Sequence, residues 1–226
     1  MEYGEIKPVR FLSRPNRFIA LAELGGEEIV CHVKNTGRCR ELLAPGASAF
    51  VEVAKNPGRK TKFDLIAVYK NHRLINIDSQ APNKLFAQWV QAGNLFQNIT
   101  LFHPETRYKN SRFDFYLEAD GRKIFVEVKG VTLEENGVVL FPDAPTERGA
   151  RHLRELIDAT HEGYDAYVVF VVQMKNVHYF SPNDRTDATF GQALREAHTA
   201  GVNILAVDCI VTPEKLSIAD FVPVVL

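Results

Sequence analysis

The sequence predicts an all-β N-terminal part followed by an α/β domain. Short strand-like segments separated by turn residues run from residue 17 to residue 78. After about residue 82, amphipathic helix patterns alternate with strands. One of these strands, 166–174, is almost continuously apolar, which is typical of a central strand buried on both faces. With 226 residues, 46% of them hydrophobic, the chain can form two cores. We therefore expect two domains, residues 1–82 and residues 83–226.

The N-terminal segments fit a small closed barrel. Gly, Pro and Asn turn signals separate the candidate strands from one another. Five short strands in about 60 residues match the strand count of an OB-like barrel. The candidate strands are 17–24, 27–33, 48–54, 62–70 and 73–78.

The C-terminal half predicts helices and strands in a defined order. A helix comes first, then strands that include a hairpin around Asp120–Gly121, then a helix, a strand, a helix and a last strand. The predicted helices are 83–94, 147–161 and 188–200, and the predicted strands are 112–119, 123–133, 166–174 and 202–208.

The bulk composition indicates a cytoplasmic protein. The first ten residues contain no apolar run, so we expect no secretory signal, and no stretch approaches the length of a membrane span. Three cysteines without a CxxC pair predict no disulfide framework and fit a reducing compartment. We expect no membrane partner, and the sequence leaves open whether the chain is a monomer or a homodimer.

The charge is divided unevenly along the chain. The formal net charge is −1, but residues 1–82 carry +4 and residues 83–226 carry −5. This division favours a phosphate-binding module joined to a metal-binding module. The alternative is that so small a difference arises by chance.

The hairpin of strands 112–119 and 123–133 carries the main functional signal. Alternate residues of a strand share a face, so the apolar residues of both strands can enter one core. Asp114, Glu127 and Lys129 then lie together on the opposite face. The inward sets are Phe113, Phe115 and Leu117 in the first strand and Ile124, Val126 and Val128 in the second.

Two carboxylates and an amine suit phosphodiester hydrolysis. Asp114 and Glu127 offer the hard oxygen ligands that Mg²⁺ or Mn²⁺ takes, and such an ion activates water and polarises a phosphoryl oxygen. The backbone carbonyl of Val128 and the carboxylate of Glu105 are further candidate ligands. Lys129 is expected to orient the water or to neutralise charge in the transition state. The alternative is a solvated ion pair of little energetic value.

Basic residues in both halves are candidates for nucleic-acid binding. Two basic turns lie among the N-terminal strands, and Arg148 and His152 lie four residues apart on one face of the predicted helix 147–161. The alternative is two solvated loops and a capped helix with a polar face. The candidates are Lys34, Arg38, Arg40, Arg59, Lys60, Arg107, Arg148 and His152.

The chain resembles a known family over nearly its whole length. The stretches RPNRFIA, CHVKNTGR, ELLAPG, RKTKFDL, SRFDF, VEVKGVTL and FPDAPTERGARHLREL are similar to those of the sugar fermentation stimulation protein A (SfsA) family. The resemblance implies an OB-like domain followed by a PD-(D/E)xK nuclease-like α/β domain, whose element order the C-terminal half shares. It also implies DNA binding and a link to the regulation of sugar (maltose) metabolism.

The resemblance assigns roles to particular residues. It places Asp114, Glu127 and Lys129 at the nuclease-like positions and Glu105 at a preceding acid, whereas Gln88 stands where the family commonly has glutamate. The leading hypothesis is therefore a metal-dependent nuclease acting on DNA or RNA. The alternatives are a DNA-binding regulator that does not cleave and an α/β protein with a surface ion pair.

Overall fold

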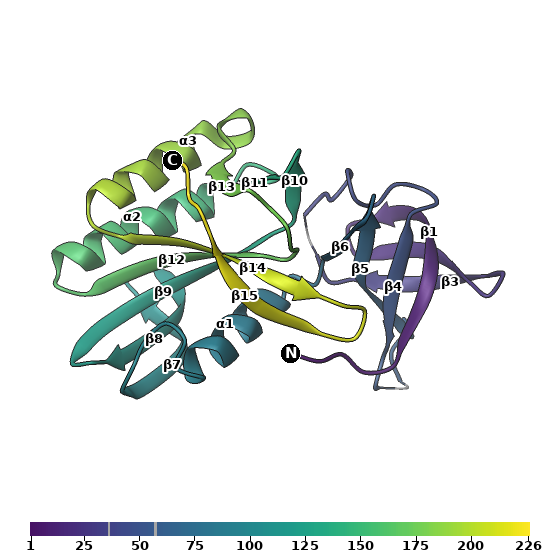
Figure 1. The fold of residues 1–226 in the computed structure, drawn as a ribbon, viewed down its shortest axis with the longest axis horizontal. Helices are drawn as coiled ribbons and strands as arrows, with labels where there is room; N and C mark the ends of the chain where they lie inside the picture. Colours follow the sequence, from purple (N-terminus) through teal and green to yellow (C-terminus); the bar gives the residue numbers. More distant parts are fainter. Residues whose placement is uncertain (36, 57) are drawn as a thin grey trace.

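The computed structural model describes residues 1–35, 37–56 and 58–226. Figure 1 shows a β-barrel at one end of the molecule and a larger part, with a sheet and helices, at the other. The two parts that the sequence predicted are thus both present.

The barrel is one sheet that closes on itself. Its strand order is β3-β2-β1-β4-β5-β6, and a parallel pairing of β3 with β5, from Cys31↔Phe63 to Val33↔Leu65, joins the two sides. Closure leaves a core of small and medium apolar side chains, among them Ala20, Val51 and Leu65, that are fully buried. The strands are β1 (Ile6–Asn16), β2 (Ile19–Leu24), β3 (Glu27–Val33), β4 (Ser48–Val53), β5 (Phe63–Lys70) and β6 (Arg73–Asn76).

The first barrel strand was not predicted. β1 contains two prolines and two arginines, which conceal the alternation that buries Val9 and Phe11. Pro8 lies in the part of β1 that pairs with β4, before the pairing with β2 begins at Arg10. Its missing N–H therefore breaks no hydrogen bond to β2, which is why a proline is tolerated in this strand.

The larger part is a six-stranded mixed sheet with the order β15-β14-β12-β9-β8-β7. The three central strands, β9, β12 and β14, are parallel, so their carboxyl ends lie at one edge. The strands are β7 (Ile99–Tyr108), β8 (Ser111–Ala119), β9 (Arg122–Val131), β12 (Asp165–Val172), β14 (Asn203–Val211) and β15 (Leu216–Val222). A small second sheet has the order β10-β11-β13, with β10 (Leu133–Glu135), β11 (Val138–Phe141) and β13 (Tyr179–Pro182).

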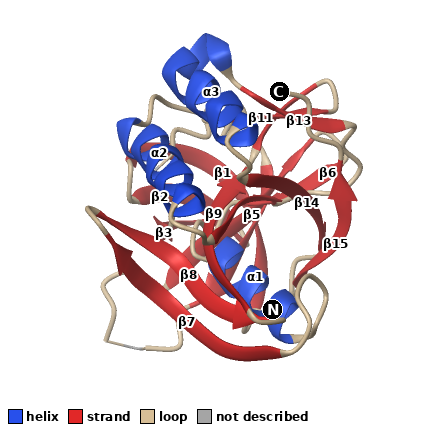
Figure 2. Cartoon of the chain, turned by 90° about the vertical axis from the view of Figure 1, so that its left-hand side faces the viewer, coloured by secondary structure: helices blue, strands red, loops and turns tan. Residues whose placement is uncertain are grey.

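Helices cover both faces of the six-stranded sheet. α1 (Ala81–Gln91) packs on one face, where Phe86 and Val90 meet Val126 and Val169 in one core. α2 (Glu147–His161) and α3 (Asp184–Thr199) pack side by side on the other face, as Figure 2 shows. The bounds of α2 agree with the predicted helix 147–161, whereas β7, β10, β11, β13 and β15 were not predicted.

The barrel sits at the carboxyl edge of the parallel strands. Gln173 follows β12 and donates hydrogen bonds to Asn76 Oδ1 at 2.8 Å and to the Asp78 carbonyl at 3.0 Å. Glu134, after β9, forms ion pairs with Lys70 at 2.8 Å and Arg73 at 3.0 Å in the barrel. In open α/β sheets this carboxyl edge is where ligands bind.

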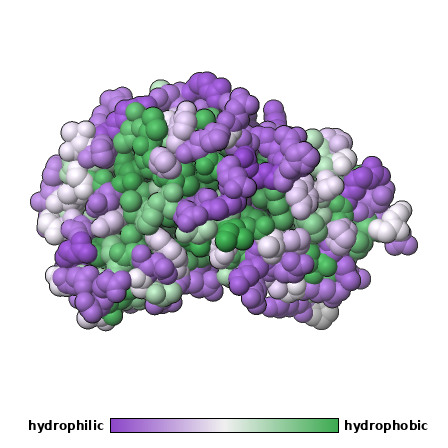
Figure 3. All heavy atoms as spheres, viewed as in Figure 1, coloured by the Kyte–Doolittle hydropathy of each residue, from purple (hydrophilic) through white to green (hydrophobic). Residues whose placement is uncertain are grey.

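The outer surface is mostly hydrophilic on the face shown in Figure 3, with apolar side chains among the polar ones. The exposed apolar side chains include Ile210 on β14 and Phe221 on β15. None of the helices in the described part of the chain is long and apolar enough to cross a bilayer.

Candidate functional site

The ladder between β8 and β9 ends where the candidate site begins. Cα pairs run from Ala119↔Arg122 to Phe115↔Val126 and stop there. Asp114 comes next on β8, and its Oδ2 accepts a hydrogen bond from the backbone N–H of Val128 at 2.8 Å. A carboxylate thus takes the place of a backbone acceptor at the point where the two strands separate.

The expected alternation of apolar residues also breaks at Asp114. Phe115 stacks on Phe86 of α1 with a centroid distance of 5.2 Å, but Phe113 packs on Phe125, at 5.3 Å, in the core beneath α2 and α3. The prediction that Phe113 shares a face with Phe115 is therefore wrong. Strand parity holds only while a strand keeps its ladder, and β8 leaves its ladder with β9 at this residue.

Glu127 is the buried centre of the site. Its side chain is 4% exposed, and its Oε1 lies 2.5 Å from Lys129 Nζ and 2.6 Å from His152 Nδ1. Its Oε2 is also buried and has no hydrogen-bond partner among the described residues. A buried carboxylate oxygen without a partner is costly, so this atom is available to a cation or another donor.

Four elements converge on the two carboxylates. α1 contributes Asn83, whose Nδ2 donates to Asp114 Oδ1 at 2.7 Å. β8 supplies Asp114, β9 supplies Glu127 and Lys129, and α2 supplies His152. The structure therefore brings Asp114, Glu127 and Lys129 together. It adds Asn83, to which the sequence assigned no role at the site, because that role depends on how α1 packs against β8.

The pKa values of the two carboxylates are shifted in opposite directions. Burial and the charge of Glu127 raise the pKa of Asp114 to about 6. Burial also acts to raise the pKa of Glu127, but Lys129 and His152 outweigh it and lower that pKa below its usual range. Carboxylates whose pKa values are driven apart in one cleft are characteristic of functional sites.

His152 serves Glu127 and is not free for a ligand. Its ring is 1% exposed, and Arg148 Nε donates to its Nε2 at 3.3 Å. Because an arginine N–H can only donate, Nε2 must accept, and the ring proton is on Nδ1, facing Glu127. The sequence placed His152 among the nucleic-acid contacts, whereas the structure places it behind a carboxylate.

A divalent cation would find few protein ligands here. Within the described part of the chain, no three side chains of His, Cys, Asp or Glu are grouped as a metal site. The donor set fits a cation that keeps several waters, since Glu127 Oε2 has no partner among the described residues and Asp114 lies beside it. Asp114, Glu127 and Lys129 together carry one net negative charge when both carboxylates are ionised, which also favours a cation.

Glu105 is not brought to the other carboxylates. Its side chain is 68% exposed and pairs with Arg112 at 3.4 Å. It lies on β7 between the pairs Pro104↔Phe115 and Thr106↔Phe113, so its backbone is opposite Asp114, with a φ of 54°. This left-handed conformation is unusual for a side chain larger than glycine. In this conformation the side chain of Glu105 lies in solvent.

Two of the predicted nucleic-acid residues belong to an ion network of the barrel. Lys34 Nζ lies 3.3 Å from Asp64, 3.4 Å from Asp78 and 3.7 Å from Glu52. Arg59 donates to both oxygens of Asp64, at 2.6 and 3.0 Å. Burial acts to raise the pKa of Asp64, but Arg59 and Lys34 outweigh it and lower that pKa. These two cations are already paired with carboxylates of the protein and are therefore less available to a phosphate.

The other predicted basic residues are exposed. They lie on two loops of the barrel, on β7 and in the first turn of α2. Arg148 is the member that also contacts the site, through His152. The exposed residues are Arg38, Arg40, Lys60, Arg107 and Arg148.

A small cavity of about 100 Å³ opens beside the site, toward the barrel. Gly130, the residue after Lys129, lines it together with Asn35 of the barrel and Asp143 of the α/β domain. A Cβ on Gly130 would lie 2.7 Å from Gln173 Oε1 and 2.7 Å from Pro82 Cγ. The glycine therefore allows the first turn of α1 and the Gln173 side chain to approach β9 closely next to the candidate site.

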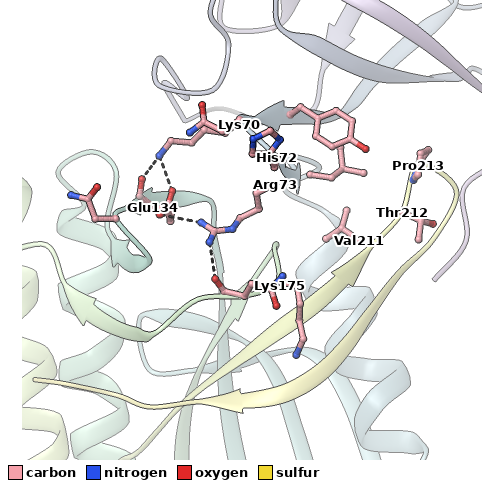
Figure 4. Close-up of a pocket in the computed structure, with 13 residues that line it drawn as sticks. Lys70, His72, Arg73, Glu134, Lys175, Val211, Thr212 and Pro213 are labelled. Atoms are coloured by element: carbon pink, nitrogen blue, oxygen red, sulfur yellow. Dashed lines mark hydrogen bonds and ion pairs between the residues drawn. The ribbon is translucent and has the colours of Figure 1, made fainter.

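A larger cavity, about 750 Å³, lies elsewhere between the two parts (Figure 4). Its cations are already neutralised: Lys70 and Arg73 bind Glu134, and Lys175 lies 2.8 Å from Asp208. Burial acts to raise the pKa of Glu134, but Lys70, Arg73 and the Gly137 N–H outweigh it and lower that pKa to about 2. This cavity contains none of the candidate site residues.

Family models match both parts of the chain. The model described as "Sugar fermentation stimulation protein RE domain" matches residues 80–215, and the "SfsA N-terminal OB domain" matches residues 12–77. The chain belongs to the sugar fermentation stimulation protein family. The family resemblance and the fold class, an OB-like barrel followed by a nuclease-like α/β domain, are thereby confirmed.

Full-length relatives and a solved structure agree with this assignment. The chain is 58% identical over 226 residues to the sugar fermentation stimulation protein homolog of Clostridium beijerinckii, covering 100% of both chains. It is 60% identical to that of Desulfitobacterium hafniense (strain Y51), covering 100% of this chain and 99% of the relative. The structure of Pyrococcus furiosus SfsA in complex with Ca²⁺ is 30% identical, with a TM-score of 0.90 and coverage of 100% and 98%.

Proposed function

We propose that the chain is a metal-dependent nuclease of the PD-(D/E)xK type that hydrolyses phosphodiester bonds in DNA, in the cytoplasm. The observation that carries the proposal is Glu127 Oε2, a buried carboxylate oxygen without a partner among the described residues, beside Asp114 and Lys129. A family relative that covers this whole chain is described in complex with Ca²⁺. Three buried free cysteines fit a reducing compartment.

The ligands we propose come from β8 and β9. Asp114, Glu127 and the Val128 carbonyl would hold Mg²⁺ or Mn²⁺, and Glu105 would join only if its exposed side chain turned inward. When bound, such an ion supplies Lewis acidity toward a phosphoryl oxygen and lowers the pKa of a bound water. Mg²⁺ keeps much of its water shell, so two carboxylates suffice.

The chain's own residues prepare the site for this chemistry. Asn83 and the Val128 N–H fix both oxygens of Asp114, and His152 fixes Glu127. Lys129 is 17% exposed, so its ammonium can reach both Glu127 and an incoming phosphate. There it would stabilise negative charge that develops on the phosphate and orient the attacking water.

The exposed arginines and lysines would hold the nucleic-acid backbone. Arg38, Arg40 and Lys60 lie on loops of the barrel, and Arg107 and Arg148 lie on the α/β domain. Phosphate contacts of this kind position the strand without reading its sequence and weaken as salt is added. The barrel at the carboxyl edge of the sheet would keep the bound strand near Lys129.

The deciding experiment is a cleavage assay on the full chain. Labelled single- and double-stranded DNA and RNA are incubated with the protein in Mg²⁺, in Mn²⁺ or in EDTA. We expect cleavage that needs the divalent ion and that Glu127→Gln and Asp114→Asn abolish, while both variants still bind the nucleic acid. Absence of cleavage on every substrate, together with no detectable Mg²⁺ or Mn²⁺ binding, would refute the nuclease proposal.

One observation favours a second candidate, a DNA-binding regulator that does not cleave. The described residues bring only two acidic side chains to the site, and Glu127 is already paired with Lys129 at 2.5 Å. An ion pair of this kind can be structural. For this candidate, the cleavage assay gives no product, while salt-sensitive DNA binding persists and Lys129→Met lowers the stability of the protein.

A further inference from the structure

Resting on the nuclease proposal, we infer that Arg148 and His152 form a positioning relay that couples the binding of a nucleic-acid phosphate to the binding of a divalent cation. The relay runs from the exposed first turn of α2 through the buried His152 ring to Glu127. It requires no movement of the backbone. The His152 ring contacts Arg148 and Glu127 and does not touch the reacting atoms, so His152 is a positioning residue.

The inner half of the relay is fixed by geometry. His152 Nδ1 donates to Glu127 Oε1 at 2.6 Å, and the ring stands edge-on to Phe113 with a centroid distance of 6.1 Å. At 1% exposure, His152 is packed within the core. The donor directs Oε1 toward α2, which leaves Oε2, without a partner among the described residues, to face the cation. A histidine that orients a metal-binding carboxylate commonly tunes the affinity of a site.

The outer half of the relay ends in solvent. Arg148 uses its Nε to donate to His152 Nε2 at 3.3 Å, a long hydrogen bond. The side chain is exposed, so the two Nη groups are free to form a bidentate contact with a phosphate. A phosphate held there orients the planar guanidinium, which shortens the bond to His152 and in turn holds Glu127 more firmly. The first turn of α2, whose unsatisfied N–H groups attract anions, adds to this preference.

The inference predicts a thermodynamic coupling that can be measured without cleavage. If phosphate binding at Arg148 orders Glu127, nucleic acid must tighten cation binding and the cation must tighten nucleic-acid binding by the same factor. Ca²⁺ is the probe, and a short DNA duplex supplies the phosphates. We expect the duplex to lower the Kd for Ca²⁺ by about 5-fold or more, as is typical of coupled sites.

The experiment titrates Ca²⁺ by calorimetry into the full chain, with and without saturating duplex, and subtracts a titration of the duplex alone. Arg148→Ala should remove the coupling, measured as the ratio of the Kd for Ca²⁺ without duplex to the Kd for Ca²⁺ with saturating duplex. Arg151→Ala is the matched control, because Arg151 is an exposed arginine on the same helix and forms no hydrogen bond or ion pair with the site within the described part of the chain. It should retain the full coupling. If Ca²⁺ were coordinated directly by the DNA phosphate alone, Arg148→Ala would keep the coupling, and the relay would be refuted.

Variants of His152 test the middle of the relay. His152→Asn keeps an N–H donor near the position of Nδ1 but loses the acceptor for Arg148, so it should still bind Ca²⁺ without DNA and should lose the coupling. His152→Leu should weaken Ca²⁺ binding in both conditions. Coupling that survives in folded His152→Asn would overturn the relay. If the wild type binds no Ca²⁺ at all, the nuclease proposal itself fails, whereas Ca²⁺ binding that DNA does not change defeats the relay alone.

Discussion

Asn83 on α1 donates a hydrogen bond to Asp114 on β8, with a distance of 2.7 Å between Nδ2 and Oδ1. It is the one contact by which the first helix reaches the carboxylates among the described residues. Gln88 is exposed and lies five residues further along the helix. At 100° per residue that offset turns Gln88 away from the side of the helix that bears Asn83.

The first prediction concerns a third carboxylate on α1. Asn83→Asp replaces a donor to Asp114 with a like charge, so the melting temperature of the cation-free protein should fall. Ca²⁺ should restore it by more than in the wild type, because three carboxylates then surround the ion. Gln88→Glu makes the same kind of change on the exposed side and should alter neither quantity. Equal responses of the two variants in thermal melts with EDTA and with Ca²⁺ would contradict this.

The second prediction follows from the raised pKa of Asp114. The pKa of about 6 in the folded protein lies above the ordinary value of 3.8, so the folded state binds the proton more tightly. The resulting stabilisation is fully present below about pH 4 and is lost as the pH rises through 6, at a cost of about 3 kcal/mol. Asp114→Asn removes this cost. It also leaves a single side-chain oxygen to accept from both Asn83 and the Val128 N–H, which costs about 1 kcal/mol.

We therefore expect Asp114→Asn to be more stable than the wild type by about 1–2 kcal/mol at pH 8 in EDTA, and no more stable at pH 4. Urea unfolding at both pH values measures the difference. A variant that is less stable than the wild type at pH 8 would show that the two hydrogen bonds of Asp114 outweigh its electrostatic cost.

The third prediction concerns the competition between this proton and a cation for the Asp114 carboxylate. A cation binds the ionised form of Asp114, so binding must displace a proton below about pH 6. The affinity for Ca²⁺ should be constant above about pH 7 and should fall as the pH drops through 6, approaching 10-fold for each pH unit. Calorimetry in buffers of different ionisation enthalpy reports the released proton directly. In Asp114→Asn the remaining affinity should lose this dependence, and a wild-type affinity that is flat from pH 5 to pH 8 would exclude Asp114 as a ligand.

Strand parity was sufficient to predict the approach of Asp114, Glu127 and Lys129, because all three belong to adjacent strands of one hairpin. The same parity was wrong for Phe113, since it assumes a continuous ladder and β8 leaves its ladder at Asp114. Local pattern also predicted α2 well, because Thr146 caps it through the Gly149 N–H and its apolar positions recur at helical spacing.

The parts that the sequence did not predict depend on tertiary contacts. Prolines in β1 conceal its alternation of buried and exposed residues, and β15 is stabilised as a strand by its pairing with β14. His152 and Arg148 were recognised as one helical face, but the partner of that face, Glu127, is 25 residues away in sequence. Lys34 and Arg59 were placed among the nucleic-acid contacts because Asp64 and Asp78, their partners in the barrel, join them only once the barrel closes.

The fourth prediction separates catalysis from binding at Lys129. Lys129→Met keeps the length of the side chain and removes its charge, so the site becomes more negative. The affinity for Ca²⁺ should stay the same or rise, while any Mg²⁺-dependent cleavage should slow by about 10²–10³-fold, the usual effect of removing one group that stabilises transition-state charge. Parallel calorimetry and single-turnover assays measure the two effects. A loss of cation affinity equal to the loss of rate would instead make Lys129 a structural partner of Glu127.

The last prediction separates two adjacent basic residues of the barrel. Arg59 forms two hydrogen bonds with Asp64, which is 4% exposed, whereas Lys60 is exposed. Arg59→Ala leaves that carboxylate with Lys34 and His32 only and should destabilise the protein by about 1–2 kcal/mol, since the arginine itself is partly solvated. It should change DNA affinity little when the variant is folded.

Lys60→Ala should leave stability within about 0.5 kcal/mol but weaken DNA binding and reduce the slope of log K against log salt by about 1. Urea unfolding and DNA titrations at several salt concentrations test both variants. If Arg59→Ala lowers the salt slope as Lys60→Ala does, without loss of stability, then the Arg59–Asp64 pair opens to bind phosphate, and Arg59 returns to the nucleic-acid surface.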